Sequence, residues 1–154
     1  MPAVLRYATA ALYTLLALTM TACQRDALPE PAYGISRCAR CDAVIADAGF
    51  AAQFRRADGL VQSFDDPACL FAALRAEPSL PPDIRFRDHN NARWVGPADV
   101  WFARTAATAA HGSGWAAYAS FSAAQEAVTA GGSGEILPFD RAKDQLGREP
   151  GNAP

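Results

Sequence analysis

The chain has 154 residues, with 14 basic and 16 acidic side chains and a formal net charge of −2 at pH 7. No run of Lys and Arg offers a track for phosphates, so the composition argues against nucleic acid binding. The sequence also lacks a nucleophile with a base at suitable spacing, a glycine-rich phosphate loop and a pair of catalytic acids. We therefore expect a binding protein rather than an enzyme.

The first 22 residues have the features of a bacterial secretory signal. Arg6 is followed by an apolar run that ends near Met20, which suits a signal h-region and is short for a membrane span. The run ends in "TMTAC", and the small residue before Cys23 resembles a lipobox, in which the signal is cut and the cysteine is acylated. The alternative is cleavage at an A-x-A-like site that leaves Cys23 unmodified. We expect a periplasmic lipoprotein, and by resemblance to sorted lipoproteins Gln24 favours the outer membrane.

Removing residues 1–22 leaves a chain of single-domain size. The stretch "QRDALPEPAYGIS" is rich in Pro and polar residues without an apolar period, which is typical of a tether, so residues 23–36 are expected to be anchor and tether. The folded domain is then predicted over 37–143. Residues 141–154 are charged and carry Gly and Pro, so we expect fraying there and a disordered tail over 144–154.

Two strand-like runs open the domain. They are "FAAQF" at 50–54 and "LVQSF" at 60–64, and the Asp58-Gly59 pair between them is a strong hairpin signal because Gly accepts a positive φ.

The spacing of the apolar residues then changes to that of a helix, which is predicted over 67–75. Asp65 or Asp66 is expected to cap it, with Pro67 at the first helical position. These carboxylates are better explained as caps than as catalytic acids. Cys69 lies on the first turn among apolar residues, where a free cysteine behaves as a small hydrophobic side chain.

Further strand-like runs follow at 84–88, 100–104, 115–121 and 135–139. A second helix is predicted over 122–130, with Ser122 and Gln125 as a capping box and Gly131 as the C-cap.

The order of strands and helix in the first half thus recurs in the second. This order predicts an α+β fold of two similar small halves, about 37–80 and 81–143, each with short antiparallel strands and one helix.

The cysteine count constrains the chemistry. If Cys23 is acylated, Cys38, Cys41 and Cys69 remain, an odd number in an oxidising compartment. At least one thiol must then be buried, paired between chains or used.

The C-x-x-C pair admits several interpretations. It can form a small structural disulfide. A zinc clip needs four ligands, and only Cys69 with His111 or His89 is left to complete one. A redox pair needs a helix N-terminus and a lowered thiol pKa, whereas Asp42 beside the pair disfavours a thiolate.

One resemblance covers most of the chain. "CARCDAVIAD", "FAAQF", "DG", "FDDPACLF", Trp94 and "GEILPFDRA", in that order behind a lipoprotein signal, resemble the NosL family of copper-binding accessory lipoproteins of nitrous-oxide reductase maturation. The resemblance spans about residues 38–143. It implies a periplasmic Cu(I) carrier on two similar α+β halves, whose partners are a copper enzyme or its assembly factors.

The sequence departs from this family at both thioether ligands. The family motif is C-x-x-C-x-M with a second methionine further on, whereas Ala43 and Trp115 stand at these positions here. Trp115 is expected to be a core residue. The resemblance then implies a metal site of Cys38, Cys41 and His111, because Cu(I) is a soft ion that accepts two or three sulfur or nitrogen donors.

Two functions of different classes follow. The first is a lipid-anchored Cu(I) carrier with altered ligands, and the second is a metal-free lipoprotein that serves as a scaffold on the same fold. A thiol redox protein is a third and weaker hypothesis. His89 is expected to be a solvated loop residue.

Overall fold

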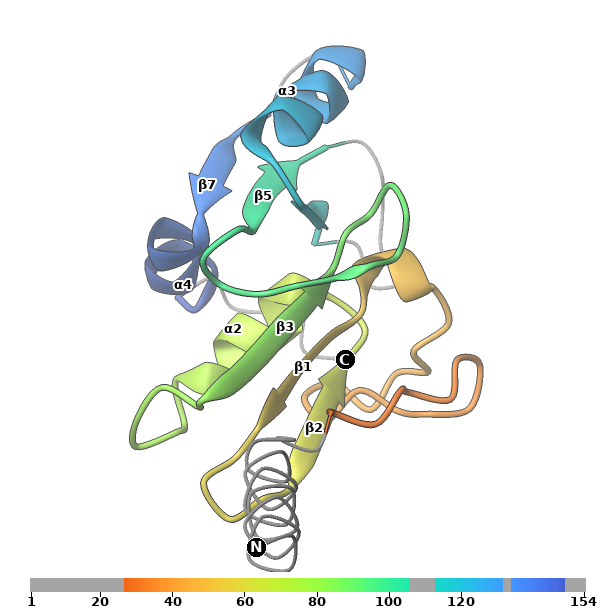
Figure 1. Cartoon of the computed structure of the whole chain (residues 1–154), viewed down its shortest axis with the longest axis vertical. Helices are drawn as coiled ribbons and strands as arrows, with labels where there is room; N and C mark the ends of the chain where they lie inside the picture. Colours follow the sequence, from red (N-terminus) through yellow and green to blue (C-terminus); the bar gives the residue numbers. More distant parts are fainter. Residues whose placement is uncertain (1–26, 106–112, 132–133, 149–154) are drawn as a thin grey trace, which may run out of the picture.

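The computed structural model describes residues 27–105, 113–131 and 134–148, and it shows an α+β protein of two small antiparallel sheets with helices beside them (Figure 1). The elements in chain order are η1 (Ala48–Phe50), β1 (Ala52–Arg55), β2 (Val61–Phe64), α2 (Pro67–Leu74), β3 (Asp83–Arg87), β4 (Trp94–Val95), β5 (Trp101–Arg104), β6 (Trp115–Tyr118), α3 (Phe121–Ala130), β7 (Ile136–Pro138) and α4 (Phe139–Leu146). Among the helices described, none is long and apolar enough to cross a membrane. The predicted fold class is confirmed.

The two halves share one topology. The first sheet has the strand order β2-β1-β3-β4 and the second has β6-β5-β7, all antiparallel. Each half therefore runs strand, strand, helix, strand, with its first strand in the centre. The predicted internal repeat is therefore present in the order of the elements, and the first half has in addition the short strand β4, which is not among the strand-like runs predicted from the sequence.

Local signals explain how the first half forms. Gly59 has a φ of +87° at the hairpin between β1 and β2, and the Asp58 carboxylate accepts a hydrogen bond of 3.0 Å from the Leu60 N–H. Of the two candidate caps of α2, Asp66 is the N-cap, and Pro67 follows at the first helical position as predicted.

Helix α3 begins one residue earlier than predicted. Its N-cap is Ser120, whose hydroxyl accepts a hydrogen bond of 3.2 Å from the Ala123 N–H. The predicted capping box of Ser122 and Gln125 is wrong, because the extended backbone that a cap needs is found at Ser120. The C-cap at Gly131 is confirmed.

The core joins the two halves. Phe71 of α2 lies 5.1 Å from Phe102 of β5 between ring centroids, and Phe86 of β3 lies 4.8 Å from the same ring. His89, two residues after β3, donates its backbone N–H to the Ala117 carbonyl of β6, and its ring centroid lies 4.6 Å from that of Phe50. His89 is thus half-buried where the halves meet, and not the fully solvated loop residue that was expected.

The folded part begins before Arg37, where the domain was predicted to start. The Arg85 guanidinium donates a hydrogen bond of 2.8 Å to the Leu28 carbonyl, and the Trp94 indole N–H donates one of 2.9 Å to the Glu30 carboxylate. The described part of the expected tether thus lies along the outer face of the first sheet. The residues that bind it, such as Arg85 and Trp94, are far away in the sequence, so no local pattern of residues predicts these contacts.

The folded part also continues past residue 143. Helix α4 begins at Phe139, the last residue of a predicted strand, and continues into residues predicted to fray, where Ala142 and Leu146 are buried. The Arg75 guanidinium of the first half donates a hydrogen bond of 2.6 Å to the Gly147 carbonyl that follows this helix. The amphipathic spacing of its few apolar residues was hidden by the charged residues between them.

We predict that Leu146→Ala lowers the free energy of unfolding by about 2–4 kcal/mol, because Leu146 is 1% exposed and its removal leaves a cavity in the shared core. Leu80→Ala is the matched control, since Leu80 is 54% exposed and its loss changes stability by no more than about 0.5 kcal/mol. Equal chemical denaturation curves for the two variants would contradict the packing of α4.

Candidate metal centre

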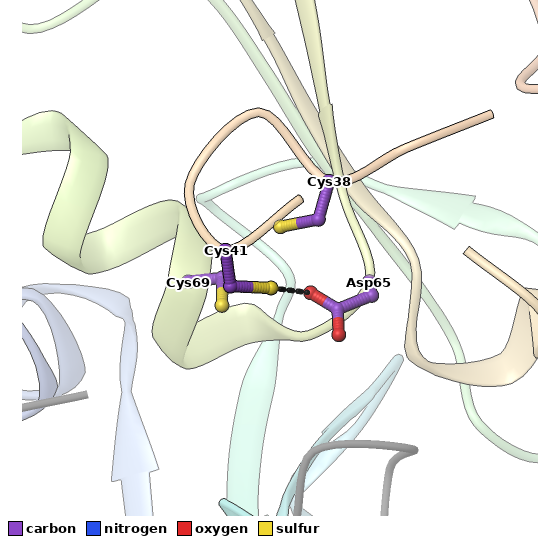
Figure 2. Close-up of side chains that lie close together, drawn as sticks. All are labelled: Cys38, Cys41, Asp65 and Cys69. Atoms are coloured by element: carbon purple, nitrogen blue, oxygen red, sulfur yellow. Dashed lines mark hydrogen bonds between the residues drawn. The ribbon is translucent and has the colours of Figure 1, made fainter. Parts of the chain in front are cut away.

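The C-x-x-C pair lies on a tight loop. The Cys38 N–H donates a hydrogen bond of 2.7 Å to the Ala43 carbonyl, and the Asp42 N–H donates one of 3.0 Å back to the Cys38 carbonyl. Asp42 itself has a φ of +62°, a conformation that Asp tolerates better than most residues. The loop turns the Cys41 side chain back toward that of Cys38 (Figure 2).

This loop is held against the end of β2. The Ala39 N–H donates a hydrogen bond of 2.9 Å to the Ser63 carbonyl, which is one residue from the end of that strand. Asp65 follows β2 directly, and Cys69 lies in the first turn of α2. Figure 2 shows that the side chains from these three segments converge on one point.

The convergence produces a compact donor set. The sulfurs of Cys38, Cys41 and Cys69 and a carboxylate oxygen of Asp65 all lie within 4.8 Å of one another. The Cys41 thiol donates to Asp65 Oδ1 across 3.6 Å. Cys38 and Asp65 are 3% and 4% exposed, whereas the other two cysteines are partly exposed. The site therefore has a buried floor and an accessible side.

The three cysteines among the described residues are free thiols, so the alternative of a disulfide in the C-x-x-C pair is not realised in the structure. A hydrogen bond from the Cys69 thiol lowers the pKa of Cys38 to about 7, against the opposing effect of burial. The same hydrogen bond, together with burial, raises the pKa of Cys69 above its ordinary value. Burial raises the pKa of Cys41 to about 11. Cys38 is thus the thiol that ionises around neutral pH, while Cys41 and Cys69 stay protonated there.

The turn from β2 to α2, which carries Asp65 and leads to Cys69, has a counterpart in the second half. The connection from β6 to α3 repeats the one from β2 to α2, and Ser120 caps its helix as Asp66 caps α2. Ala119 and Ala123 stand at the positions equivalent to Asp65 and Cys69. The connection in the second half forms with alanine at both positions, so this type of turn does not itself need a carboxylate or a thiol there.

Of the predicted metal ligands, the structure brings Cys38 and Cys41 together, while His111, like the lipidation residue Cys23, lies outside the described residues. Ser113, two residues after His111, donates a hydrogen bond to the Asp66 carboxylate. Trp115 is fully buried, as expected for a core residue.

Sequence reasoning missed the participation of Cys69 and Asp65. Cys69 was predicted to be a small hydrophobic side chain, and its sulfur instead lies among the other donors. The signal was present in "FDDPAC". A cysteine three residues after the N-cap lies on the first helical turn, which carries it to the end of the strand that precedes the cap.

Comparison with known proteins adds a fold relationship. No protein-family model and no curated protein matches the chain. Among solved structures it is similar to the crystal structure of the copper chaperone NosL from Shewanella denitrificans, with a TM-score of 0.62 and 16% identity. The match covers 73% of this chain and 93% of that one. At this identity the similarity shows a shared fold.

We predict that the reduced protein shows one thiolate that forms with a midpoint near pH 7, because the pKa of Cys38 is lowered to about 7 while that of Cys41 is raised to about 11. The thiol is protonated below the midpoint and ionised above it, so thiolate absorbance rises with pH. The difference between wild type and Cys38→Ser isolates this step.

Two variants test the cause of this shift. Cys69→Ser keeps a donor and leaves the midpoint near 7, whereas Cys69→Ala removes the donor and raises the midpoint toward the ordinary thiol value. Equal midpoints in these two variants would show that Cys69 is not responsible.

Proposed function

We propose that this protein is a membrane-anchored periplasmic Cu(I) carrier that serves the assembly of a copper enzyme such as nitrous-oxide reductase. The observation that carries the proposal is the group of three cysteine sulfurs within 4.8 Å of one another. It is supported by the fold shared with a copper chaperone, which also favours a role without catalysis.

The chemistry of the donors suits a soft monovalent ion. Cu(I) has a closed d shell, prefers sulfur and accepts two or three ligands in low-symmetry geometry. Cys38, Cys41 and Cys69 can supply three thiolates, so Cys69 provides a sulfur in a chain that lacks the family's thioethers at Ala43 and Trp115.

The accessible side of the site suits a carrier rather than a permanent metal centre. Cys41 and Cys69 are partly exposed, whereas Cys38 is buried. A thiolate of a partner can approach the metal from the side of the exposed sulfurs while the buried one still holds it. Transfer by ligand exchange needs such an open approach. We keep His111 as a proposed supporting ligand.

The proposed anchor restricts the reach of the domain. Acylation at Cys23 would place the lipid five residues before Leu28, whose carbonyl is bound by Arg85 on the first sheet. Five extended residues span at most roughly 18 Å. The domain would then stay close to the outer membrane surface, where we expect it to meet its partner.

We predict that either Cys38→Ser or Cys41→Ser abolishes tight Cu(I) binding, and that Cys69→Ser weakens it strongly, because each removes a thiolate. His111→Ala is expected to weaken it by about 10- to 100-fold as a supporting donor. The measurement is an anaerobic titration of reduced protein against a chromogenic Cu(I) chelator. His89→Ala is the matched control, since the chain has two histidines and His89 packs at the join between the halves.

Wild-type Cu(I) affinity in the double variant Cys38→Ser/Cys41→Ser would end the copper proposal. Absence of tight Cu(I) binding in the reduced wild-type protein would instead favour a metal-free scaffold on the same fold, the alternative that the loss of both thioether positions supports.

We also predict that the full-length protein fractionates with membranes and that Cys23→Ser releases or mislocalises it, because acyl chains on this cysteine supply the attachment. Cys69→Ser, which leaves the amino-terminal segment intact, is the control and should remain with the membranes. Unchanged attachment of Cys23→Ser would remove the lipoprotein hypothesis.

A further inference from the structure

The carboxylate of Asp65 is the donor in the cluster that Cu(I) does not explain. Its side chain is 4% exposed, and its Oδ1 atom lies 3.6 Å from the Cys41 sulfur. A carboxylate oxygen is a hard donor, which suits divalent ions better than a soft monovalent one. Placing a carboxylate in a buried site is also unfavourable unless it gains something in return.

Capping of α2 does not account for the Asp65 carboxylate. The N-cap of α2 is Asp66, so Asp65 is not needed to begin the helix. In the second half the equivalent position is Ala119, and the same connection from strand to helix forms there. What the structure does show is that this carboxylate belongs to the same donor set as the three sulfurs.

The geometry matches a tetrahedral ion with mixed donors. With Zn–S distances of about 2.3 Å and Zn–O distances of about 2.0 Å, a regular tetrahedron separates sulfur from oxygen by about 3.5 Å and two sulfurs by about 3.8 Å. The observed separation of Cys41 Sγ and Asp65 Oδ1 is 3.6 Å, and no two of the four donors are farther apart than 4.8 Å. Small shifts of the thiols would close the set around one ion.

We propose that Cys38, Cys41, Cys69 and Asp65 form a four-coordinate site for Zn²⁺ with three sulfurs and one oxygen. Binding replaces the thiol protons by the metal, releases them to solvent and changes no oxidation state. The site shares its thiols with the proposed copper site. The inference rests on the proposed function only in predicting that Zn²⁺ and Cu(I) exclude one another.

Zn²⁺ and Cu(I) would compete for the same thiols but would differ in their need for Asp65. Cu(I) needs the sulfurs alone, whereas Zn²⁺ uses all four donors, so the two ions depend differently on Asp65. Zn²⁺ would occupy the thiols when copper is scarce, and arrival of Cu(I) would displace it. Removing the carboxylate should therefore shift the preference of the site toward Cu(I).

The test measures both metals on the full chain, purified in mild detergent and reduced under anaerobic conditions. Zn²⁺ affinity is measured by competition with a chelator, and Co²⁺ serves as a spectroscopic probe of the same site. We expect one ion per chain. Bound Co²⁺ should show thiolate-to-metal charge transfer and the intense visible d–d bands of four-coordinate cobalt.

Asp65→Asn should lower Zn²⁺ affinity by at least about 10- to 100-fold and leave Cu(I) affinity unchanged. Asp42→Asn is the matched control, because it removes an exposed carboxylate beside Cys41 that is not in the cluster. Asp65→Ala is the second variant, and the alanine at the equivalent position of the other half shows that it is compatible with the turn.

Three results would overturn the inference. They are wild-type Zn²⁺ affinity in both Asp65 variants, a Co²⁺ spectrum without thiolate charge transfer, and an equal loss of both metals, which would mean that Asp65 only accepts the Cys41 proton. Binding of Cu(I) without Zn²⁺ would defeat this inference and leave the proposed function intact. Binding of Zn²⁺ without Cu(I) would contradict the proposed function and leave this inference intact.

Discussion

The hydrogen bond of 2.9 Å from the Ala39 N–H to the Ser63 carbonyl fixes the position of the C-x-x-C loop. Because β2 is an edge strand, its outer carbonyls are open to another segment, and the loop occupies one of them. This contact carries Cys38 and Cys41 to the point where β2 ends and α2 begins. The convergence of the three thiols depends on this placement, since the loop precedes the hairpin in sequence and has no helix of its own.

The candidate metal ligands lie in the first half, whereas the second half contributes mainly to the core. The two halves share one topology and similar helix caps, yet the donors beside the strand-to-helix connection occur in the first half and alanines in the second. The second half instead supplies Trp115 and Phe102 to the core, and its Ser113 hydroxyl donates to the Asp66 carboxylate. Ser113 of the second half thus contacts the N-cap of α2, the helix of the first half that carries Cys69.

How much the sequence predicted depends on how local each signal is. The hairpin at Gly59 and the start of α2 were predictable because neighbouring residues determine them. The packing of Glu30 against the first sheet was not, because its partner Trp94 lies far along the chain. The site follows the same rule: the C-x-x-C pair is a local motif, whereas its meeting with Asp65 and Cys69 needs the loop to dock on a strand.

The protonation of the cluster determines how it can hold and release a metal. Near neutral pH, Cys38 supplies the thiolate that can bind first, since its pKa is about 7. Cys41 and Cys69, whose pKa values are raised, must each lose a proton before they can bind. A metal bound by the three sulfurs would therefore meet one thiol that ionises near neutral pH and two that must lose a proton on binding. Return of protons to Cys41 and Cys69 would favour release of the metal, and these are the two partly exposed thiols that a partner could reach.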